Sequence, residues 1–175
     1  NMKNGIRIRT SSFTRHHGHA SLSKAKTNGN YVNSMMALQE ALNEGYDEAL
    51  MLDVKGFASE GSGENIFIVS ENNIYTPDLS SALPGITRDT IFTLAAAIGY
   101  KIVEKNITCD DICNADEAFF TGTAAEVTPV RELDGKKIGS GTRGPVTKKL
   151  QSLYFDCVHG RNNQYLYWLA KGRCS

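Results

Sequence analysis

Short apolar segments alternate with longer helical patterns along most of this sequence, and that alternation limits the folds open to it. Apolar runs bounded by Gly, Asn or charged residues are typical of strands. Strands are therefore predicted at 5–9, 49–52, 65–69, 74–76, 101–104 and 118–120, with a hairpin joining the third and fourth. Apolar stripes at helical spacing predict helices at 31–43, from 87 to about 98, and from 145 to about 158. Interleaved helices and strands predict an α/β (mixed α+β) fold.

The ends of these helices carry residues suited to those positions. Gly45 and Gly99 stand where left-handed C-terminal caps belong, because glycine adopts positive φ angles without strain. Thr87 is predicted to cap the second helix with its hydroxyl. Thr108 and Asp111 have the spacing of a capping box and predict one further, short helix.

The composition is that of an ordinary soluble globular protein and excludes several functional classes. The 175 residues are 41% hydrophobic and 22% charged, enough for one domain with an apolar core. Basic and acidic residues both number 19, so the zero net charge argues against nucleic-acid binding and electrostatic membrane attachment. The longest apolar stretch, Leu94–Ile98, is too short to span a bilayer, and no signal peptide is visible. Four cysteines without a CxxC pair favour a reducing cytoplasm.

Two loops next to predicted elements are suited to holding a ligand. Leu83–Thr87 leads into a helix N-terminus, where the amides of Ile86 and Thr87 can face a phosphate with the helix dipole behind them. A plain N-cap explains the same residues equally well. Gly122-Thr123-Ala124 allows a ligand to approach the backbone closely, although it also suits an ordinary loop.

Lys26 lies just before the first predicted helix, where ordered backbone can hold a lysine in place. Most lysines are solvated at the surface, and an arbitrary lysine here is expected to be one of them. A function for Lys26 therefore depends on the motifs around it.

Two other patterns are interpreted as structural. Residues 139–144 satisfy GxGxxG ahead of a helix, but no βαβ unit continues and no acidic residue follows at the spacing of a dinucleotide site. We interpret these glycines as a loop that turns the chain into the helix opened by Pro145. His16, His17 and His19 have no acidic or Cys ligand nearby and are interpreted as polar surface rather than a metal site.

Four motifs follow one another along the chain: AKTNGNY at 25–31, EGSGENIF at 60–67, LPGITRD at 83–89 and GTAAEVTPV at 122–130. With them the sequence resembles the branched-chain amino-acid aminotransferases, pyridoxal-phosphate enzymes of fold type IV, from about Ser11 to Tyr154. The resemblance implies the large C-terminal domain of the D-amino-acid aminotransferase-like fold, an open pseudo-barrel of strands with flanking helices. Residues 1–175 are then expected to form a single pyridoxal-phosphate-binding domain.

The resemblance also implies roles for single residues. Lys26 matches the lysine that forms a Schiff base with pyridoxal 5′-phosphate and then moves the proton between Cα and C4′. Glu60 matches the carboxylate that faces the pyridine nitrogen and keeps the ring an electron sink. Tyr31 matches the tyrosine that bonds the ring oxygen O3′; taken alone, it would be interpreted as a packing aromatic.

Phosphate and substrate contacts follow from the other two motifs. The resemblance places five further residues against the cofactor: Leu83, Ile86, Thr87, Gly122 and Thr123. It places the amides of Thr123 and Ala124 against the substrate carboxylate. Glu64, Asn65 and Arg88 belong to the same motifs, and for them a supporting role is about even with ordinary ion pairs and turn bonds.

For the parent enzyme the resemblance implies amino-group transfer from leucine, isoleucine or valine to 2-oxoglutarate, without a metal. D-Amino-acid aminotransferase, aminodeoxychorismate lyase and a non-catalytic remnant domain are the alternatives. Members of the family carry a further N-terminal domain that supplies an arginine to the phosphate and part of the substrate pocket, so a truncated or partial chain with weak activity of its own is expected. A homo-oligomer is expected as well. The segment from Cys157 onward, residues 157–175, is expected to diverge from the matched part.

Overall fold

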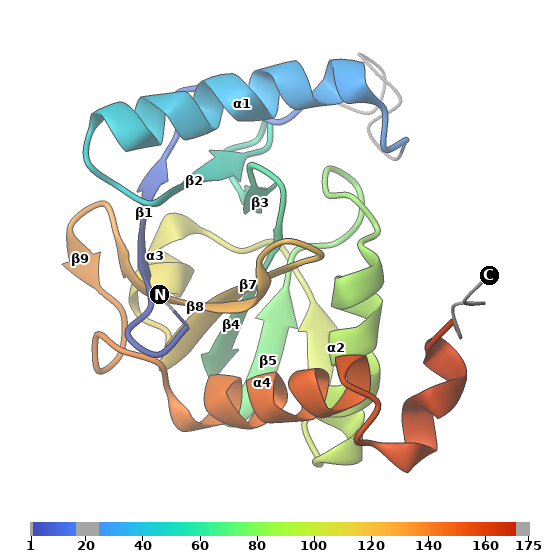
Figure 1. Ribbon diagram of the computed structural model, residues 1–175. Coiled ribbons are helices and arrows are strands. Elements are labelled where there is room, and N and C mark those ends of the chain that lie inside the picture. Colours follow the sequence, from blue (N-terminus) through green and yellow to red (C-terminus); the bar gives the residue numbers. More distant parts are fainter. Residues whose placement is uncertain (1, 17–24, 171–175) are drawn as a thin grey trace.

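A curled sheet of nine strands dominates the computed structural model, which describes residues 2–16 and 25–170 (Figure 1). The strands are β1 (Ile6–Thr10), β2 (Glu48–Leu52), β3 (Ala58–Gly61), β4 (Asn65–Ser70), β5 (Asn73–Thr76), β6 (Ile102–Glu104), β7 (Glu117–Gly122), β8 (Glu126–Leu133) and β9 (Lys136–Lys137). The helices are α1 (Asn28–Asn43), α2 (Ile86–Ala97), α3 (Cys109–Cys113), α4 (Pro145–Val158) and the 3-10 helix η1 (Asn163–Trp168).

The sheet is mixed, with the order β3-β2-β1-β8-β7-β4-β5-β6 and with β9 paired to β8. β1 runs parallel to both β2 and β8, and β5 runs parallel to β6. The other neighbouring pairs are antiparallel, including the predicted β4–β5 hairpin, whose turn has positive φ angles at Glu71 and Asn72. The predicted mixed α/β class is therefore confirmed.

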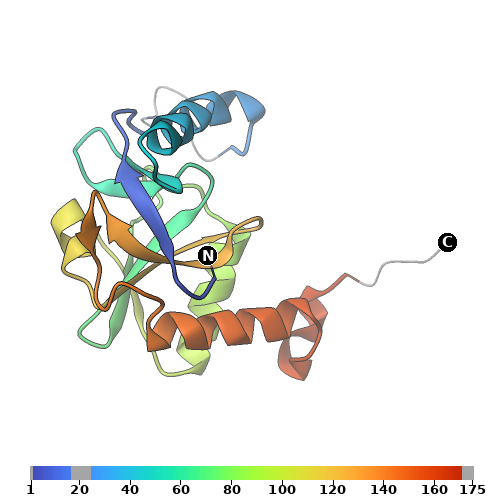
Figure 2. The same ribbon diagram turned by 60° about the vertical axis from the view of Figure 1, so that its left-hand side comes forward.

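Side chains of successive strand residues point to opposite faces of the sheet, and each face has its own core. On β4, Ile66 and Ile68 point into a cluster that also takes in side chains of β1, β2, β7 and β8 and of α3. Strands that are far apart in the sheet order share this cluster, so the sheet must curl around it, as Figure 2 shows from a second direction. The arrangement confirms the open pseudo-barrel.

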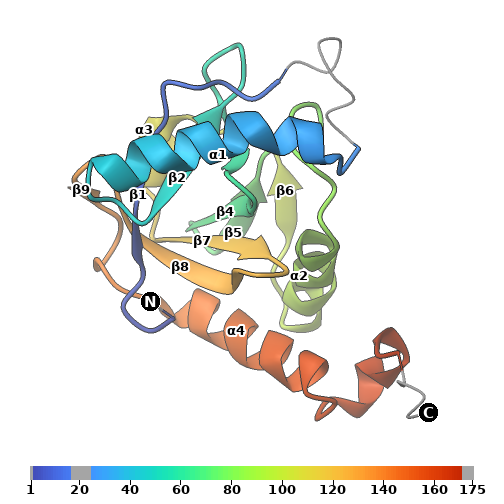
Figure 3. The ribbon, with the colours of Figure 1, turned by 45° about the horizontal axis from the view of Figure 1, so that its top comes forward.

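The outer face is covered by helices in two places. Phe67 and Phe119 stack with ring centroids 5.1 Å apart, and α2 and α4 pack on them through Leu94 and Leu150. Further along the sheet, α1 lies across β2 and buries Met51 (Figure 3). Burial of such side chains contributes about 1.5–3 kcal/mol each.

Most of the predicted elements are present, with two kinds of exception. The prediction that Thr87 caps a helix is wrong, because α2 begins at Ile86 and its N-cap is Gly85. Strands β3, β8 and β9 and helix η1 were not predicted from the sequence. In contrast, the Thr108–Asp111 capping box and the helix that opens at Pro145 are both as predicted. In the described ranges, no helix is long and apolar enough to cross a membrane.

Candidate active site

A cavity of about 210 Å³ opens where several strands end and two helices begin. Its walls come from segments far apart in the sequence: the stretch before α1, the β3–β4 turn, the turn before α2, and the end of β7 with the turn that follows it. β4 and β7 bring two of these walls together, because Asn65 at the start of β4 pairs with Thr121 near the end of β7.

The cavity gathers most of the residues singled out from the sequence. Those that line it are Lys26, Tyr31, Glu60, Glu64, Asn65, Leu83, Ile86, Thr87, Gly122 and Thr123. Ala124 is not part of the wall and lies in the exposed turn between β7 and β8. Arg88 is buried elsewhere: it donates to the Pro77 carbonyl at 3.2 Å, pairs with Glu104 and lies over the Phe92 ring. Arg88 therefore holds α2 against its surroundings and does not reach the cavity.

Lys26 and Tyr31 enter from the beginning of α1. Lys26 is exposed and lies two residues before the helix, whose N-cap Thr27 has an extended backbone. Tyr31, half-buried in the first turn, lines the same cavity. The side chain of Asn30 donates to the carbonyl of Ala25 at 3.1 Å, which ties the lysine-bearing stretch back onto the helix.

Glu60, at the end of β3, is a buried carboxylate with partners on both oxygens. Its Oε2 accepts from the backbone N–H of Leu83 at 2.9 Å and lies 3.4 Å from Nδ2 of Asn65. Its Oε1 forms an ion pair with Arg15. Burial raises the pKa of Glu60, while the charge of Arg15 opposes that rise.

Asn65 fastens the turn before α2 to the sheet. Its Nδ2 donates to the carbonyl of Leu83 at 2.9 Å, and a Cβ built on Gly85 would lie 2.3 Å from its Oδ1. Only glycine leaves room for that approach. Glu60 and Asn65 thus fix the same turn from two directions.

The N-terminus of α2 presents to the cavity backbone donors that have no partner among the described residues. Ile86 and Thr87 are its first residues, and amides there have no carbonyl one turn earlier in the helix. Burial raises the pKa of Tyr154 on α4, and the neighbouring Thr87 side chain opposes that rise. The hydroxyl of Thr121 also lines the cavity, is buried, and finds no hydrogen-bond partner among the described residues. Such donors suit an anionic group.

The N-terminus of α4, which follows the GxGxxG pattern, is closed by contrast. Glu117 accepts from the amides of Val146 and Thr147 at 2.9 and 2.8 Å and from the Thr147 hydroxyl at 2.7 Å. A side chain at Gly144 would collide with that carboxylate. The protein's own carboxylate occupies the place of a phosphate, which agrees with the interpretation of residues 139–144 as a loop.

A second acidic group lies beside Glu60. Burial, followed by the charge of the nearby Glu48, raises the pKa of Glu64 to about 7. Glu64 accepts from the amide of Gly63 at 3.0 Å, and Glu48 accepts from the amides of Ala49 and Ser62. This corner of the cavity therefore carries partial negative charge near neutral pH.

A sequence model of the amino-transferase class IV family matches residues 1–133, which is most of the chain. The chain belongs to the amino-transferase class IV family. It is 61% identical over 167 residues to the branched-chain-amino-acid aminotransferase of Pseudomonas aeruginosa, a match that covers 95% of this chain and 54% of that relative. The chain thus spans about half the length of this relative. Because the match takes in nearly all of the chain, it extends beyond Cys157.

Solved structures of the class IV family support the same fold. The branched-chain aminotransferase of Thermoproteus uzoniensis with norvaline has a TM-score of 0.92 and 45% identity, covering 95% of this chain and 56% of that one. The branched-chain amino acid aminotransferase of Thermobaculum terrenum in its PLP-form has a TM-score of 0.93 and 36% identity, covering 96% of this chain and 55% of that one. The fold expected from the motifs is confirmed.

Arg15 lines the cavity but was not predicted as a site residue from the sequence. It is buried and lines the cavity, yet in the sequence it stands in a polar, basic stretch beside His16. No local pattern separates it from a surface arginine; only its place inside the matched region could have drawn attention to it. His16 is half-buried, and His17 and His19 lie outside the described residues.

Proposed function

We propose that the whole protein is a pyridoxal-phosphate-dependent aminotransferase that moves the amino group of leucine, isoleucine or valine to 2-oxoglutarate. We propose further that residues 1–175 are its cofactor-binding domain. The observation that carries this is the cavity, where an amine at Lys26, a buried carboxylate at Glu60 and the N-terminus of α2 face one space. The names of the class IV relatives and the PLP-form of one of them point the same way.

The residues of the cavity fit this cofactor chemically. Lys26 supplies the only kind of side chain that forms a reversible covalent bond to an aldehyde through a primary amine. When bound, pyridoxal phosphate supplies an electron-withdrawing ring that makes the substrate Cα–H bond acidic. Glu60 would hold the pyridine N–H, and Tyr31 would donate to the ring oxygen. Once released from the aldehyde, the Lys26 amine would carry the proton from Cα.

Phosphate binding falls to the two turns that flank the cavity. The amides of Ile86 and Thr87 would donate to the phosphate, and the turn that includes Leu83 is fixed by Glu60 and Asn65. On the opposite wall, Gly122 and Thr123 would contribute a close backbone approach and a hydroxyl. Ala124, in the exposed turn, would offer its amide to a substrate carboxylate arriving from outside.

The branched-chain preference is supported by the relatives, because those named here are branched-chain enzymes. The alternatives, D-amino-acid aminotransferase and aminodeoxychorismate lyase, have no comparable support. An amino-donor screen with 2-oxoglutarate separates them. Preference for leucine, isoleucine and valine is expected, and preference for a D-amino acid would overturn the assignment.

Covalent capture of the cofactor tests the catalytic proposal against a non-catalytic remnant. The full-length protein mixed with pyridoxal phosphate should develop a visible absorption band that borohydride removes, leaving a mass increase on the peptide that contains Lys26. Lys26→Ala should abolish both signals. Lys101→Ala, at an exposed lysine outside the cavity, should leave both unchanged. A folded protein that gives no band refutes the proposal.

We also propose a homo-oligomer located in the cytoplasm. Val32, Met35 and Met36 form an apolar face on α1 that is 53%, 59% and 49% exposed, a pattern suited to a subunit contact. Cys109, Cys113 and Cys157 are free thiols, as is usual in a reducing compartment. Light scattering on the purified protein measures the subunit number, and a monomer would contradict the first part.

A further inference from the structure

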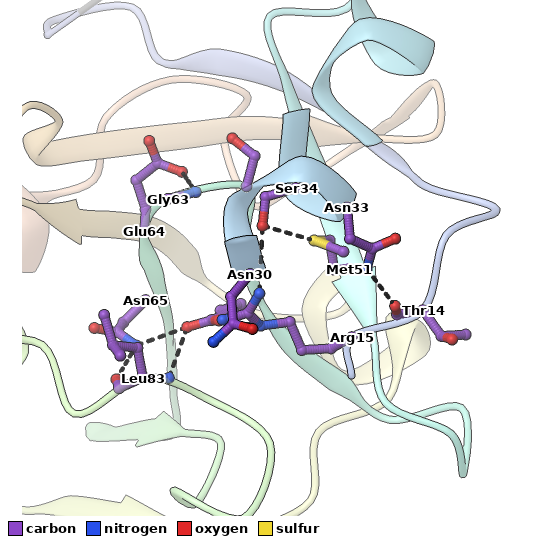
Figure 4. Close-up of polar contacts among 12 residues, drawn as sticks. Thr14, Arg15, Asn30, Asn33, Ser34, Met51, Gly63, Glu64, Asn65 and Leu83 are labelled. Carbon is purple, nitrogen blue, oxygen red and sulfur yellow. Dashed lines mark hydrogen bonds and ion pairs between the residues drawn. The ribbon is translucent and has the colours of Figure 1, made fainter. Parts of the chain in front are cut away.

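Arg15 joins the two sides of the cavity by one buried side chain. It is 8% exposed, and its backbone N–H donates to the carbonyl of Leu52 at 2.7 Å, so its Cα is anchored at the end of β2. One guanidinium nitrogen donates to Oγ of Ser34 on α1 at 3.3 Å, and another pairs with Oε1 of Glu60 on β3. Figure 4 shows Arg15 extended between Ser34 on one side and Asn65 and Leu83 on the other.

Both oxygens of the Glu60 carboxylate are held as a result. Arg15 holds Oε1, while the Leu83 amide and Asn65 hold Oε2. A carboxylate gripped on both oxygens cannot rotate about its last bond without breaking a charge-assisted contact. Its orientation toward the cavity is therefore set before any ligand arrives.

We propose that Arg15 is a positioning residue that keeps Glu60 ionised and fixed in orientation, so that Glu60 is ready to accept the N–H of a protonated pyridine ring. This proposal rests on the proposed function, which identifies the ring as that of pyridoxal phosphate. Arg15 itself acts only through Glu60.

The charges around Glu60 explain why Arg15 decides its state. Burial favours the neutral acid and raises the pKa of Glu60, and Arg15 is the largest opposing influence. Negative charge on Glu60 in turn helps to raise the pKa of the nearby Glu64. Lys26 and Tyr31 also line the cavity, but Lys26 is exposed, so solvent screens its charge. A neutral Glu60 would donate its own O–H to the ring nitrogen, whereas an ionised Glu60 accepts a hydrogen bond from the N–H of the protonated ring.

The fork of the guanidinium matters as well as its charge. An arginine reaches Oε1 of Glu60 and Oγ of Ser34 at the same time, whereas lysine has one ammonium and no fork. Arg15→Met removes both the charge and the fork while keeping a similar side-chain volume. Compared with Arg15→Met, Arg15→Lys should recover the ionisation of Glu60 more fully than the fixed orientation of its carboxylate.

The first measurement needs no cofactor. In the full-length protein labelled with ¹³C at glutamate Cδ, the Glu60 carbon is assigned by its loss in Glu60→Gln and followed against pH. Arg15→Met should move its midpoint upward by about one pKa unit or more, and Arg15→Lys should move it less. Arg88→Met is the matched control, because Arg88 is equally buried and pairs with Glu104 outside the cavity. It should leave the Glu60 midpoint unchanged.

The second measurement follows the ring. Arg15→Met should weaken pyridoxal phosphate binding about tenfold or more, as loss of a charge-assisted contact does, and should lower the pH at which the ring nitrogen loses its proton, read by ¹⁵N NMR of labelled cofactor. Glu60→Gln should behave alike, and Arg15→Met should add little to it, because Arg15 works through Glu60.

The outcomes separate this proposal from the proposed function. An unchanged Glu60 midpoint in a folded Arg15→Met protein overturns the role of Arg15, whatever the cofactor does. If Arg15→Met does not fold, an Arg15→Lys protein with the binding and midpoint of the wild type overturns the orienting role of the fork. If the midpoint moves as expected but wild-type protein forms no covalent cofactor adduct at Lys26, the proposed function fails while the effect of Arg15 on Glu60 stands.

Discussion

Replacing Gly144 by alanine tests how the N-terminus of α4 is closed. A Cβ at Gly144 would lie 2.0 Å from Cδ of Glu117 and 2.5 Å from its Oε1, well inside contact distance. The carboxylate would have to leave its three hydrogen bonds to Val146 and Thr147. Gly144→Ala should therefore remove the same interactions that Glu117→Ala removes.

The magnitude follows from those bonds. Each hydrogen bond to a charged group contributes about 1.5–3 kcal/mol, but water replaces part of what is lost at a helix end, where cap substitutions cost about 0.5–2 kcal/mol. Between these limits, we expect Gly144→Ala and Glu117→Ala each to lower the free energy of unfolding by about 3 kcal/mol. A capping contribution of this size is a large part of the stability of a domain.

The double variant supplies the decisive comparison. Once Glu117 is alanine, Gly144→Ala meets no carboxylate, and its backbone at φ −78° and ψ 171° suits alanine. In that background the substitution should be neutral or should stabilise by about 0.4–1 kcal/mol, because alanine restricts the unfolded chain. Urea unfolding followed by circular dichroism measures all four proteins. Gly29→Ala, where a Cβ meets no atom within 4 Å, is the matched control. If the double variant loses as much free energy of unfolding as the two single variants lose together, the reasoning is refuted.

Two further predictions concern the cavity. Gly85→Ala places a Cβ against Oδ1 of Asn65 and should weaken pyridoxal phosphate binding at least about tenfold by fluorescence titration. Asn65→Ala should also weaken binding, because Asn65 fixes the turn before α2, but adding Gly85→Ala to Asn65→Ala should cause little further loss, and a full additional loss would contradict the close-approach argument. Burial and Glu48 raise the pKa of Glu64 to about 7, so its stabilising contribution is present below the ordinary value and is lost as pH rises through 7. Glu64→Gln should therefore stabilise the protein more at pH 8 than at pH 4 in urea melts, and a difference independent of pH would contradict this.

Elements set by local sequence could be predicted. Thr108 and Asp111 lie within one helical turn of each other, so their capping box needs no distant partner. Pro145 opens α4 because its fixed φ suits the first helical position. Contacts between residues so close in the sequence cost little chain entropy to form, and they can be predicted without a tertiary structure.

The missed strands lack such signals. β8 contains Pro129 at a position paired with Phe119, and proline argues against a strand in the interior of a sheet. β3 includes Ser59 and Glu60, both buried, where apolar residues are expected. Glu60 is tolerated in the interior only because Arg15 and Leu83 compensate its charge and its hydrogen bonds.

The sequence by itself determined the chemistry available to this protein. Its four motifs indicated the family and the fold, and they contain most of the residues that line the cavity. Only the tertiary structure decided which of these groups work together. Both helices begin after a turn that contains glycine, and the fold closed the N-terminus of α4 with Glu117 while leaving that of α2 open to the cavity. It also paired Arg15 with Glu60. The physical reason is the same in both cases: a buried charge is stable only beside its partner, and the curl of the sheet chooses that partner from distant parts of the chain.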